Sequence, residues 1–307
     1  MSALSRLLRL WKIFGVILAV LMIALLVDHF AARRGIRAVE RSGGHAHFFF
    51  RHRESLSMRR WLMKHAPGAI ASQLKRDVDI EKVLVGSELA SDDIWPRLSH
   101  LANLSFVVCH GQDIGAAVQQ LDSLRHLTAF EIFAPGVNQA LKHLSALPHL
   151  EEIQITGPHE EPIDVSLLGD IRRLTHVMFK RTSLSHDNIV ALAKCPQLQW
   201  LFVLGPSFEP RQTISGLSHL RSATSFKEIQ LQNVIVDDDL LAELGAILSL
   251  EVIMISNDLS EPSEFTTNGL RNLDGLKQLK SFSGKSESIS KAEWNEFQSA
   301  HPRMKLY

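Results

Sequence analysis

The sequence is poor in cysteine and lacks the short motifs of the common enzyme classes. Only two cysteines, Cys109 and Cys195, occur in 307 residues. Both fall at apolar positions of the repeat described below, so they are interpreted as small buried residues and not as a nucleophile or a disulfide. No phosphate-binding, dinucleotide-binding, serine-hydrolase or zinc-protease motif is present. We therefore expect a protein that is not an enzyme and that uses no cofactor.

The formal net charge is zero, but the charges are unevenly distributed along the chain. Residues 1–76 carry 14 Lys and Arg against three acidic residues, so this segment has a net charge of +11 and the remainder −11. A basic stretch beside an apolar helix favours contact with anionic lipid headgroups. No base-reading motif accompanies the basic residues, so nucleic acid is not an expected partner.

One apolar run near the N-terminus predicts a membrane-spanning helix. Residues 13–27 contain no charge, and residues 10–32 reach the roughly 20 positions that cross a bilayer. The basic residues before the run also fit a signal peptide, but the residues after it lack a clean cleavage site. We therefore expect an uncleaved single-pass anchor in a bacterial inner membrane. Basic residues lie on both sides of the run, so charge leaves the orientation open.

From residue 77 onward the chain repeats a set of three apolar positions. The second position follows the first by three residues, and the third follows the second by two. The nine sets are Ile80, Val83, Val85; Leu104, Val107, Cys109; Leu127, Phe130, Ile132; Leu150, Ile153, Ile155; Leu174, Val177, Phe179; Leu198, Leu201, Val203; Phe226, Ile229, Leu231; Leu250, Ile253, Ile255; and Leu279, Phe282, Gly284. Successive sets begin 23 or 24 residues apart except for two steps of 28 and 29, which are interpreted as loop insertions.

Each repeat has the pattern of a short strand preceded by a short helix. The last two apolar positions alternate as in a strand whose listed side chains point inward. Leucines continue upstream at three-residue spacing, as in Leu141, Leu144, Leu147 and Leu150, which indicates a helix packed on its own strand. Ordering about 24 residues costs roughly 35 kcal/mol, more than six buried apolar side chains return, so only stacked repeats are stable.

This pattern, L-x-x-L-x-x-[apolar]-x-[apolar] with a helical return, resembles the leucine-rich-repeat family over residues 77–307. The resemblance implies an α/β solenoid of nine irregular repeats, with parallel strands on a concave face and short helices on a convex face. The chain departs from the family at the asparagine or threonine expected three residues after the last apolar position, which occurs only as Thr182.

The whole layout is similar to single-anchor repeat proteins that some bacteria carry in many copies. In those proteins an Arg-rich juxtamembrane helix, here Arg33 to Arg41, ends at a double glycine, here Gly43-Gly44. A short strand, here His45 to Phe50, and a Trp-Leu segment, here Trp61-Leu62, then lead into the first repeat. The likeness implies an architecture and no particular activity.

These observations divide the chain into four parts. We expect the anchor at 1–32, a basic juxtamembrane and N-terminal cap region at 33–76, the solenoid at 77–288 and a C-terminal cap at 289–307. In the last part, Ser290 and Glu293 form the capping box of a helix through Trp294 and Phe297. Residues 304–307 are expected to add a final edge strand.

Two polar clusters have a metal-binding and a structural interpretation. The acidic triplet Asp237 to Asp239 precedes an apolar helix at 240–248, which favours a helix N-cap over a cation site. His45, His47 and His52 resemble a zinc site, but no cysteine or carboxylate completes four ligands. We therefore predict a hydrophilic strand face there and no metal.

The residues that flank the inward positions are expected on the concave face, where most repeats are polar. Apolar side chains are concentrated at Trp200, Phe202 and Leu204, with Met178 on the neighbouring repeat. A second, weaker group comprises Phe106, Val108 and Phe133. Aromatic residues in exposed patches commonly carry binding energy. The alternative is that the inserted loop from Gly205 to Thr213, with Phe208, covers the first group.

The leading hypothesis is a membrane-anchored scaffold that binds a protein partner through the concave face of the solenoid. The alternative is a structural envelope or lipid-surface protein without a specific partner, whose basic segment from Arg51 to Arg60 lies on headgroups. An enzyme with an unrecognised site is the third hypothesis. An apolar concave patch favours the first, a wholly polar sheet face the second, and clustered titratable groups in a pocket the third.

Overall fold

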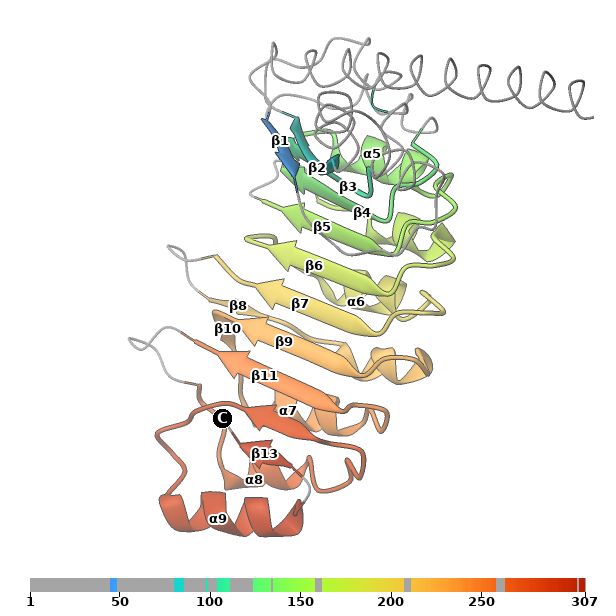
Figure 1. Cartoon of the computed structure of the whole chain (residues 1–307). Coiled ribbons are helices and arrows are strands. Elements are labelled where there is room, and N and C mark those ends of the chain that lie inside the picture. Colours follow the sequence, from blue (N-terminus) through green and yellow to red (C-terminus); the bar gives the residue numbers. More distant parts are fainter. Residues whose placement is uncertain are drawn as a thin grey trace, which may run out of the picture.

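Eleven strands form one sheet, and their order in the sheet follows their order in the sequence (Figure 1). The computed structural model describes residues 45–48, 80–85, 98, 104–110, 124–133, 135–157, 162–206, 211–257, 263–302 and 304–306. The strands of this sheet are β1 His45–Phe48, β2 Ile80–Val85, β3 Phe106–His110, β4 Ala129–Phe133, β5 Glu152–Thr156, β6 His176–Lys180, β7 Trp200–Leu204, β9 Glu228–Gln232, β11 Val252–Ser256, β12 Ser281–Ser283 and β13 Lys305–Leu306. All neighbouring strands pair in parallel except β1, which is antiparallel to β2.

The repeated apolar sets form the core, as the sequence predicts. Every apolar member from Leu104 onward is buried. The sets also share one register, since Val177 pairs with Leu201 and Leu201 with Ile229 along the sheet. Apolar side chains therefore stack from repeat to repeat, and each repeat is stabilised by its neighbours.

Short helices cover one face of the sheet and leave the other open (Figure 1). The α-helices are α5 Val137–Leu144, α6 His186–Leu192, α7 Asp238–Gly245, α8 Thr267–Arg271 and α9 Lys291–Ala300, and the 3₁₀-helices are η2 Val165–Asp170 and η3 Leu217–Ser222. The parallel α/β solenoid expected from the repeat is thus confirmed in the part of the chain that the structure describes. The open face is the one that the sequence predicts to be concave.

The leucines at three-residue spacing are only partly helical, which corrects the prediction of a continuous short helix. After α5, the Leu147 N–H donates to the Leu144 carbonyl at 3.0 Å, and the Leu150 N–H to the Leu147 carbonyl at 3.4 Å. After α6, Cys195 and Leu198 continue the chain of such bonds. A structure with three residues per turn places every third side chain on the same side. These turns, more than the α-helix, explain the spacing.

A second, two-stranded sheet joins the first of the longer steps to the 24-residue repeat that follows it. Its strands are β8 Gln212–Thr213 and β10 Val234–Ile235, which pair in parallel. The turns that precede them pack closely, because a Cβ on Gly205 would lie 2.1 Å from the carbonyl oxygen of Asn233. Asn233 itself has a φ of 53°, in the left-handed region that asparagine tolerates better than most residues. Glycine is therefore required at position 205.

The C-terminal cap agrees with the prediction. Ser290 and Glu293 form a reciprocal capping box at the start of α9, and β13 adds the last strand beside β12. Trp294 and Phe297 on this helix pack their rings against Phe282, the core residue of β12. Aromatic contacts thus close this end of the core.

Several predictions fall on residues that the structure does not describe. These are the anchor at 1–32, most of the 33–76 region, and Phe208 of the inserted loop. Strand β1 confirms a strand from His45, whereas the side chains of His45 and His47 lie outside the description. Among the described residues, no helix has the length and hydropathy needed to cross a bilayer.

Candidate functional site

The open face of the sheet carries three rows of outward side chains, one row for each exposed strand position. The first row, in strand order, is Phe106, Ala129, Glu152, His176, Trp200, Glu228, Val252, Ser281 and Lys305. The second row is Val108, Glu131, Gln154, Met178, Phe202, Gln230, Met254 and Ser283. The third row is Phe133, Thr156, Lys180, Leu204, Gln232 and Ser256. Neighbours in a row lie about 4.8 Å apart, and neighbouring rows on one strand about 6.6 Å apart.

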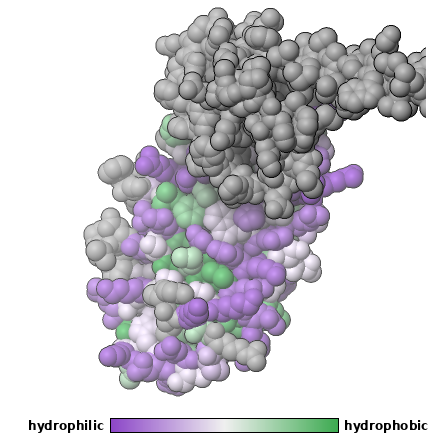
Figure 2. Space-filling model, in the orientation of Figure 1, coloured by the Kyte–Doolittle hydropathy of each residue, from purple (hydrophilic) through white to green (hydrophobic). Residues whose placement is uncertain are grey.

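The four residues of the stronger predicted group come together on two adjacent strands. Trp200, Phe202 and Leu204 occupy all three rows of β7, and Met178 pairs with Phe202 from β6. All four are half-buried. We call these four residues the β6–β7 patch. Hydrophobic side chains also gather in the middle of the face turned to the viewer in Figure 2, with hydrophilic ones around them.

The two aromatic rings of the β6–β7 patch hold each other in place. Trp200 and Phe202 stack with ring centroids 5.9 Å apart and an interplanar angle of 17°. The ring of His176, the first-row neighbour of Trp200, lies with its centroid 5.6 Å from that of Trp200, at an interplanar angle of 48°. Stacked rings lose little further conformational freedom on binding, which favours them as anchors for a partner.

The indole N–H of Trp200 is already satisfied. It donates to Oε1 of Glu228 at 3.1 Å, and the Gln230 side-chain amide donates to the same oxygen at 2.6 Å. The hydrogen bond fixes the orientation of the indole, so the rest of its exposed surface is apolar. The polar side chains of β9 therefore hold the apolar side chains of β7 in place from the neighbouring strand.

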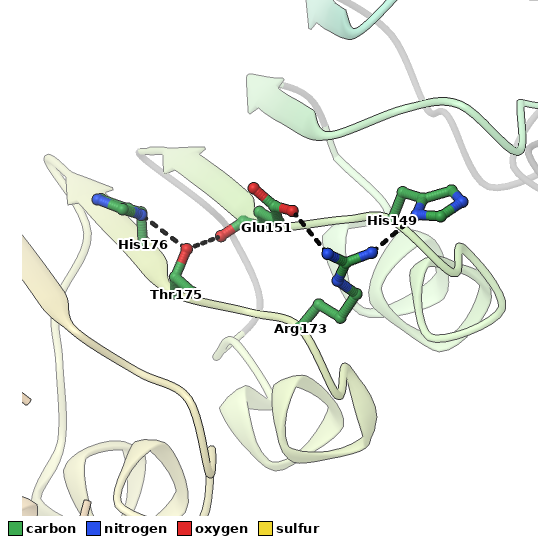
Figure 3. A network of polar contacts seen from close by, with 5 residues as sticks. All are labelled: His149, Glu151, Arg173, Thr175 and His176. Atoms are coloured by element: carbon green, nitrogen blue, oxygen red, sulfur yellow. Dashed lines mark hydrogen bonds and ion pairs between the residues drawn. The ribbon is translucent and has the colours of Figure 1, made fainter. Parts of the chain in front are cut away.

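A polar network beside the patch fixes the starts of β5 and β6 (Figure 3). The Thr175 hydroxyl donates to the backbone carbonyl of Glu151 at 3.0 Å and lies 2.8 Å from Nδ1 of His176. The Arg173 guanidinium lies 3.4 Å from a carboxylate oxygen of Glu151 and 2.9 Å from Nδ1 of His149. These contacts hold His176 where its ring meets Trp200.

The weaker predicted group is not a second exposed patch. Phe106 and Phe133 are half-buried, but Val108 is only 1% exposed, so the expectation that its side chain is exposed is wrong. Val108 pairs with Glu131 on β4. Gln154, which pairs with Glu131 from the other side, is also buried, and its side-chain amide donates to the Glu131 carboxylate.

Two apolar side chains of the open face, Met254 and Val252, were missed in the sequence. Met254 in the second row is 41% exposed, and Val252 in the first row of the same strand is half-buried. They lie two strands from Phe202 and Trp200, with the polar side chains of β9 between. The signal that could have identified them is the same alternation that identified Trp200 and Phe202.

The acidic triplet is structural, as predicted. Asp237 is the N-cap of α7, and its carboxylate accepts from the Leu240 N–H at 2.8 Å. Asp238 binds the next repeat, because its carboxylate accepts from the N–H and the hydroxyl of Thr266 at 2.6 and 2.7 Å. A Cβ on Gly269 would lie 2.3 Å from the same carboxylate, so this position excludes larger residues.

The two cysteines are buried and free, as the sequence predicts. Burial raises the pKa of the Cys195 thiol to about 12. Burial, with a smaller contribution from the Glu131 carboxylate, raises the pKa of Cys109 as well. Neither thiol is therefore activated as a nucleophile at neutral pH. Within the described ranges, no three His, Cys, Asp or Glu side chains gather in a way that would hold a metal ion.

No protein-family profile and no curated protein sequence matches the chain. Among solved structures, 72% of the chain aligns with a TDR receptor at 15% identity and a TM-score of 0.40. The aligned part spans only 36% of the receptor chain. An internalin (inlF) from Listeria monocytogenes aligns over 81% of this chain and 92% of its own, at 13% identity and a TM-score of 0.31.

Proposed function

We propose that this chain is a leucine-rich-repeat scaffold that binds a protein partner through the open face of its sheet, with the β6–β7 patch as the anchor. The observation that carries the proposal is the half-exposed stack of Trp200 and Phe202, extended by Leu204 and Met178. Monomeric proteins seldom leave such groups in contact with water without a function.

The polar surroundings of the β6–β7 patch support the same proposal. Glu228 and Gln230 border it on β9, and Lys180 borders it on β6. A protein interface combines a central aromatic anchor with a polar rim. A wholly polar sheet face, which the structural-envelope alternative predicts, does not describe this surface.

We also propose that residues 10–32 anchor the chain in a bacterial inner membrane, and that the chain has no catalytic activity. The support for the anchor is the uncharged run at 13–27 with basic residues on both sides. The support for a non-catalytic role is the absence from the sequence of the enzyme motifs named above.

Site-specific photocrosslinking tests the proposed function. The full chain carries benzoyl-phenylalanine at position 202 in one sample, and at position 248 in a control. Leu248 is 65% exposed but lies in the turn between α7 and β11, away from the open face. We expect a protease-sensitive adduct from position 202 that is absent from position 248 and is lost when Trp200→Ala is added.

Three outcomes would contradict the proposed function. The first is an adduct that forms equally at positions 202 and 248. The second is an adduct that contains lipid and no protein, which would favour the structural-envelope alternative. The third is a protein adduct at position 202 that is unaffected by Trp200→Ala.

A further inference from the structure

Charged side chains border the β6–β7 patch with opposite signs at its two ends. At the first-row end, Glu228 lies beside Trp200, and Glu152 lies one strand beyond His176. At the third-row end, Lys180 is paired with Leu204. Among the described side chains of that row, Lys180 is the only charged one.

Among the described residues, the charged groups at these two ends form no ion pair. Oε1 of Glu228 accepts hydrogen bonds from Trp200 and Gln230, which are neutral donors and leave the negative charge of the carboxylate in place. Glu152 and Lys180 make no side-chain hydrogen bond or ion pair within the described structure. Glu251, just before β11, does form ion pairs, with Lys227 at 3.0 Å and with Lys280.

We propose that the bound partner is a polypeptide segment with a short apolar stretch, bordered by a basic residue at one end and an acidic residue at the other. This inference rests on the proposed function and specifies its ligand. The apolar stretch lies on the β6–β7 patch, the basic side chain meets Glu228, and the acidic side chain meets Lys180. Glu152, about 14 Å from Glu228 along the first row, adds negative charge at the same end.

The dimensions of the patch set the length of that stretch. Trp200 and Leu204 are four residues apart on one strand, a separation of about 13 Å. An extended segment covers this distance with about four residues, and a helical one with about nine. Opposite charges at the two ends also fix the direction in which a given segment lies, which apolar contacts alone leave free.

Selection from a library of random 12-residue peptides displayed on phage tests the inference. Three baits are compared: the unchanged full-length chain, the single variant Lys180→Glu, and a double variant that combines Glu152→Lys with Glu228→Gln. The glutamine keeps Oε1 as an acceptor for Trp200. The matched controls are Lys194→Glu and the double change Glu287→Lys with Glu296→Gln, which change the net charge by the same amounts at exposed positions outside the three rows.

The unchanged chain and both controls should enrich peptides with an apolar core, one basic border and one acidic border. Lys180→Glu should enrich peptides with basic residues at both borders. The double variant should enrich peptides with acidic residues at both borders. A single peptide should change in affinity by about two- to fivefold between matched and mismatched baits, the range of a surface ion pair.

Identical charge composition in the peptides from all baits would overturn the inference, as would failure of the unchanged chain to enrich any peptide. The proposed function has a separate criterion in the same experiment. If Trp200→Ala enriches the same peptides as the unchanged chain, the β6–β7 patch is not the binding site. If that variant loses the apolar core and the charge swaps have no effect, the proposed function stands and the charge inference fails.

Discussion

Trp200 shows what alternation along a strand can and cannot predict for one residue. Its outward position follows from the pattern, because Leu201 and Val203 on either side of Phe202 are inward core residues. Its hydrogen bond to Glu228 spans 28 residues of sequence, across a loop insertion. The two residues meet only because the strands share a register that the insertion does not disturb, which the spacing alone could not establish.

Val108 and Gln154 mark the other limit of the residue pattern. Alternation gives the face on which a side chain lies, but its exposure depends on the lengths of the side chains on neighbouring strands. Both residues lie beside Glu131 in the second row, and both are buried. The stronger predicted group is therefore exposed as expected on β6 and β7, whereas the weaker group is not an exposed patch.

We predict that both thiols are unreactive in the folded chain, because Cys109 and Cys195 are at most 1% exposed and burial raises their pKa values. A thiol reagent at neutral pH should label neither cysteine within minutes and should label both after unfolding in guanidinium. The control Ser288→Cys places a thiol at an exposed position and should label at once. Rapid labelling of the unchanged folded chain would contradict the assigned core.

At the scale of elements, the strands were predicted more accurately than the helices. A strand position depends on a two-residue alternation, which the apolar sets carry directly. The three-residue leucine spacing fits both a helix and a series of three-residue turns, and the structure uses both. Strand β8 and its partner β10 were not predicted, because they comprise two residues each and lie outside the repeated apolar sets.

The C-terminal cap provides a pH-dependent prediction. Glu293 accepts hydrogen bonds from the hydroxyls of Thr267 and Ser290 and from the Ser290 N–H, which lowers its pKa from 4.5 to about 2. A lowered pKa means that this contribution to stability is complete above pH 4.5 and is lost as the pH falls towards 2. The urea midpoint of the unchanged chain should therefore fall in this range.

Glu293→Gln should reduce the slope of the urea midpoint with pH between pH 4.5 and pH 2. Glu296→Gln, at an exposed position of the same helix, serves as the control and should keep the slope of the unchanged chain. Equal slopes in the two variants would show that the capping carboxylate does not couple α9 to α8.

The proposed anchor gives a prediction for the N-terminal segment. Deletion of residues 1–32 should move the protein from the membrane pellet to the soluble fraction, because the uncharged run is the feature that predicts insertion. Fractionation with an antibody to the C-terminus measures this change. Full-length protein that is already soluble after gentle lysis would contradict the anchor.

At the scale of the molecule, the repeat length predicts the stacked parallel strands, and the two longer steps between apolar sets predict inserted loops. Sets that begin 23 or 24 residues apart place parallel strands side by side with one shared core. Thr182 is the only asparagine or threonine three residues after the last apolar position of a set. At the corresponding position of a later repeat, Val234 is buried, and its N–H donates to the Asn257 side chain at 3.3 Å. The antiparallel pairing of β1 was not predicted, because apolar spacing does not encode strand direction.

The central claim is that the β6–β7 patch binds a partner and is not part of the core. The double change Trp200→Ala and Phe202→Ala tests it most directly, with partner binding and urea unfolding measured on the same preparation. Because both rings are partly exposed, we expect loss of binding with a smaller loss in the free energy of unfolding than the core double change Phe179→Ala and Phe226→Ala causes. A double variant at 200 and 202 that keeps its partner, or one that loses as much stability as this core control, would contradict the claim.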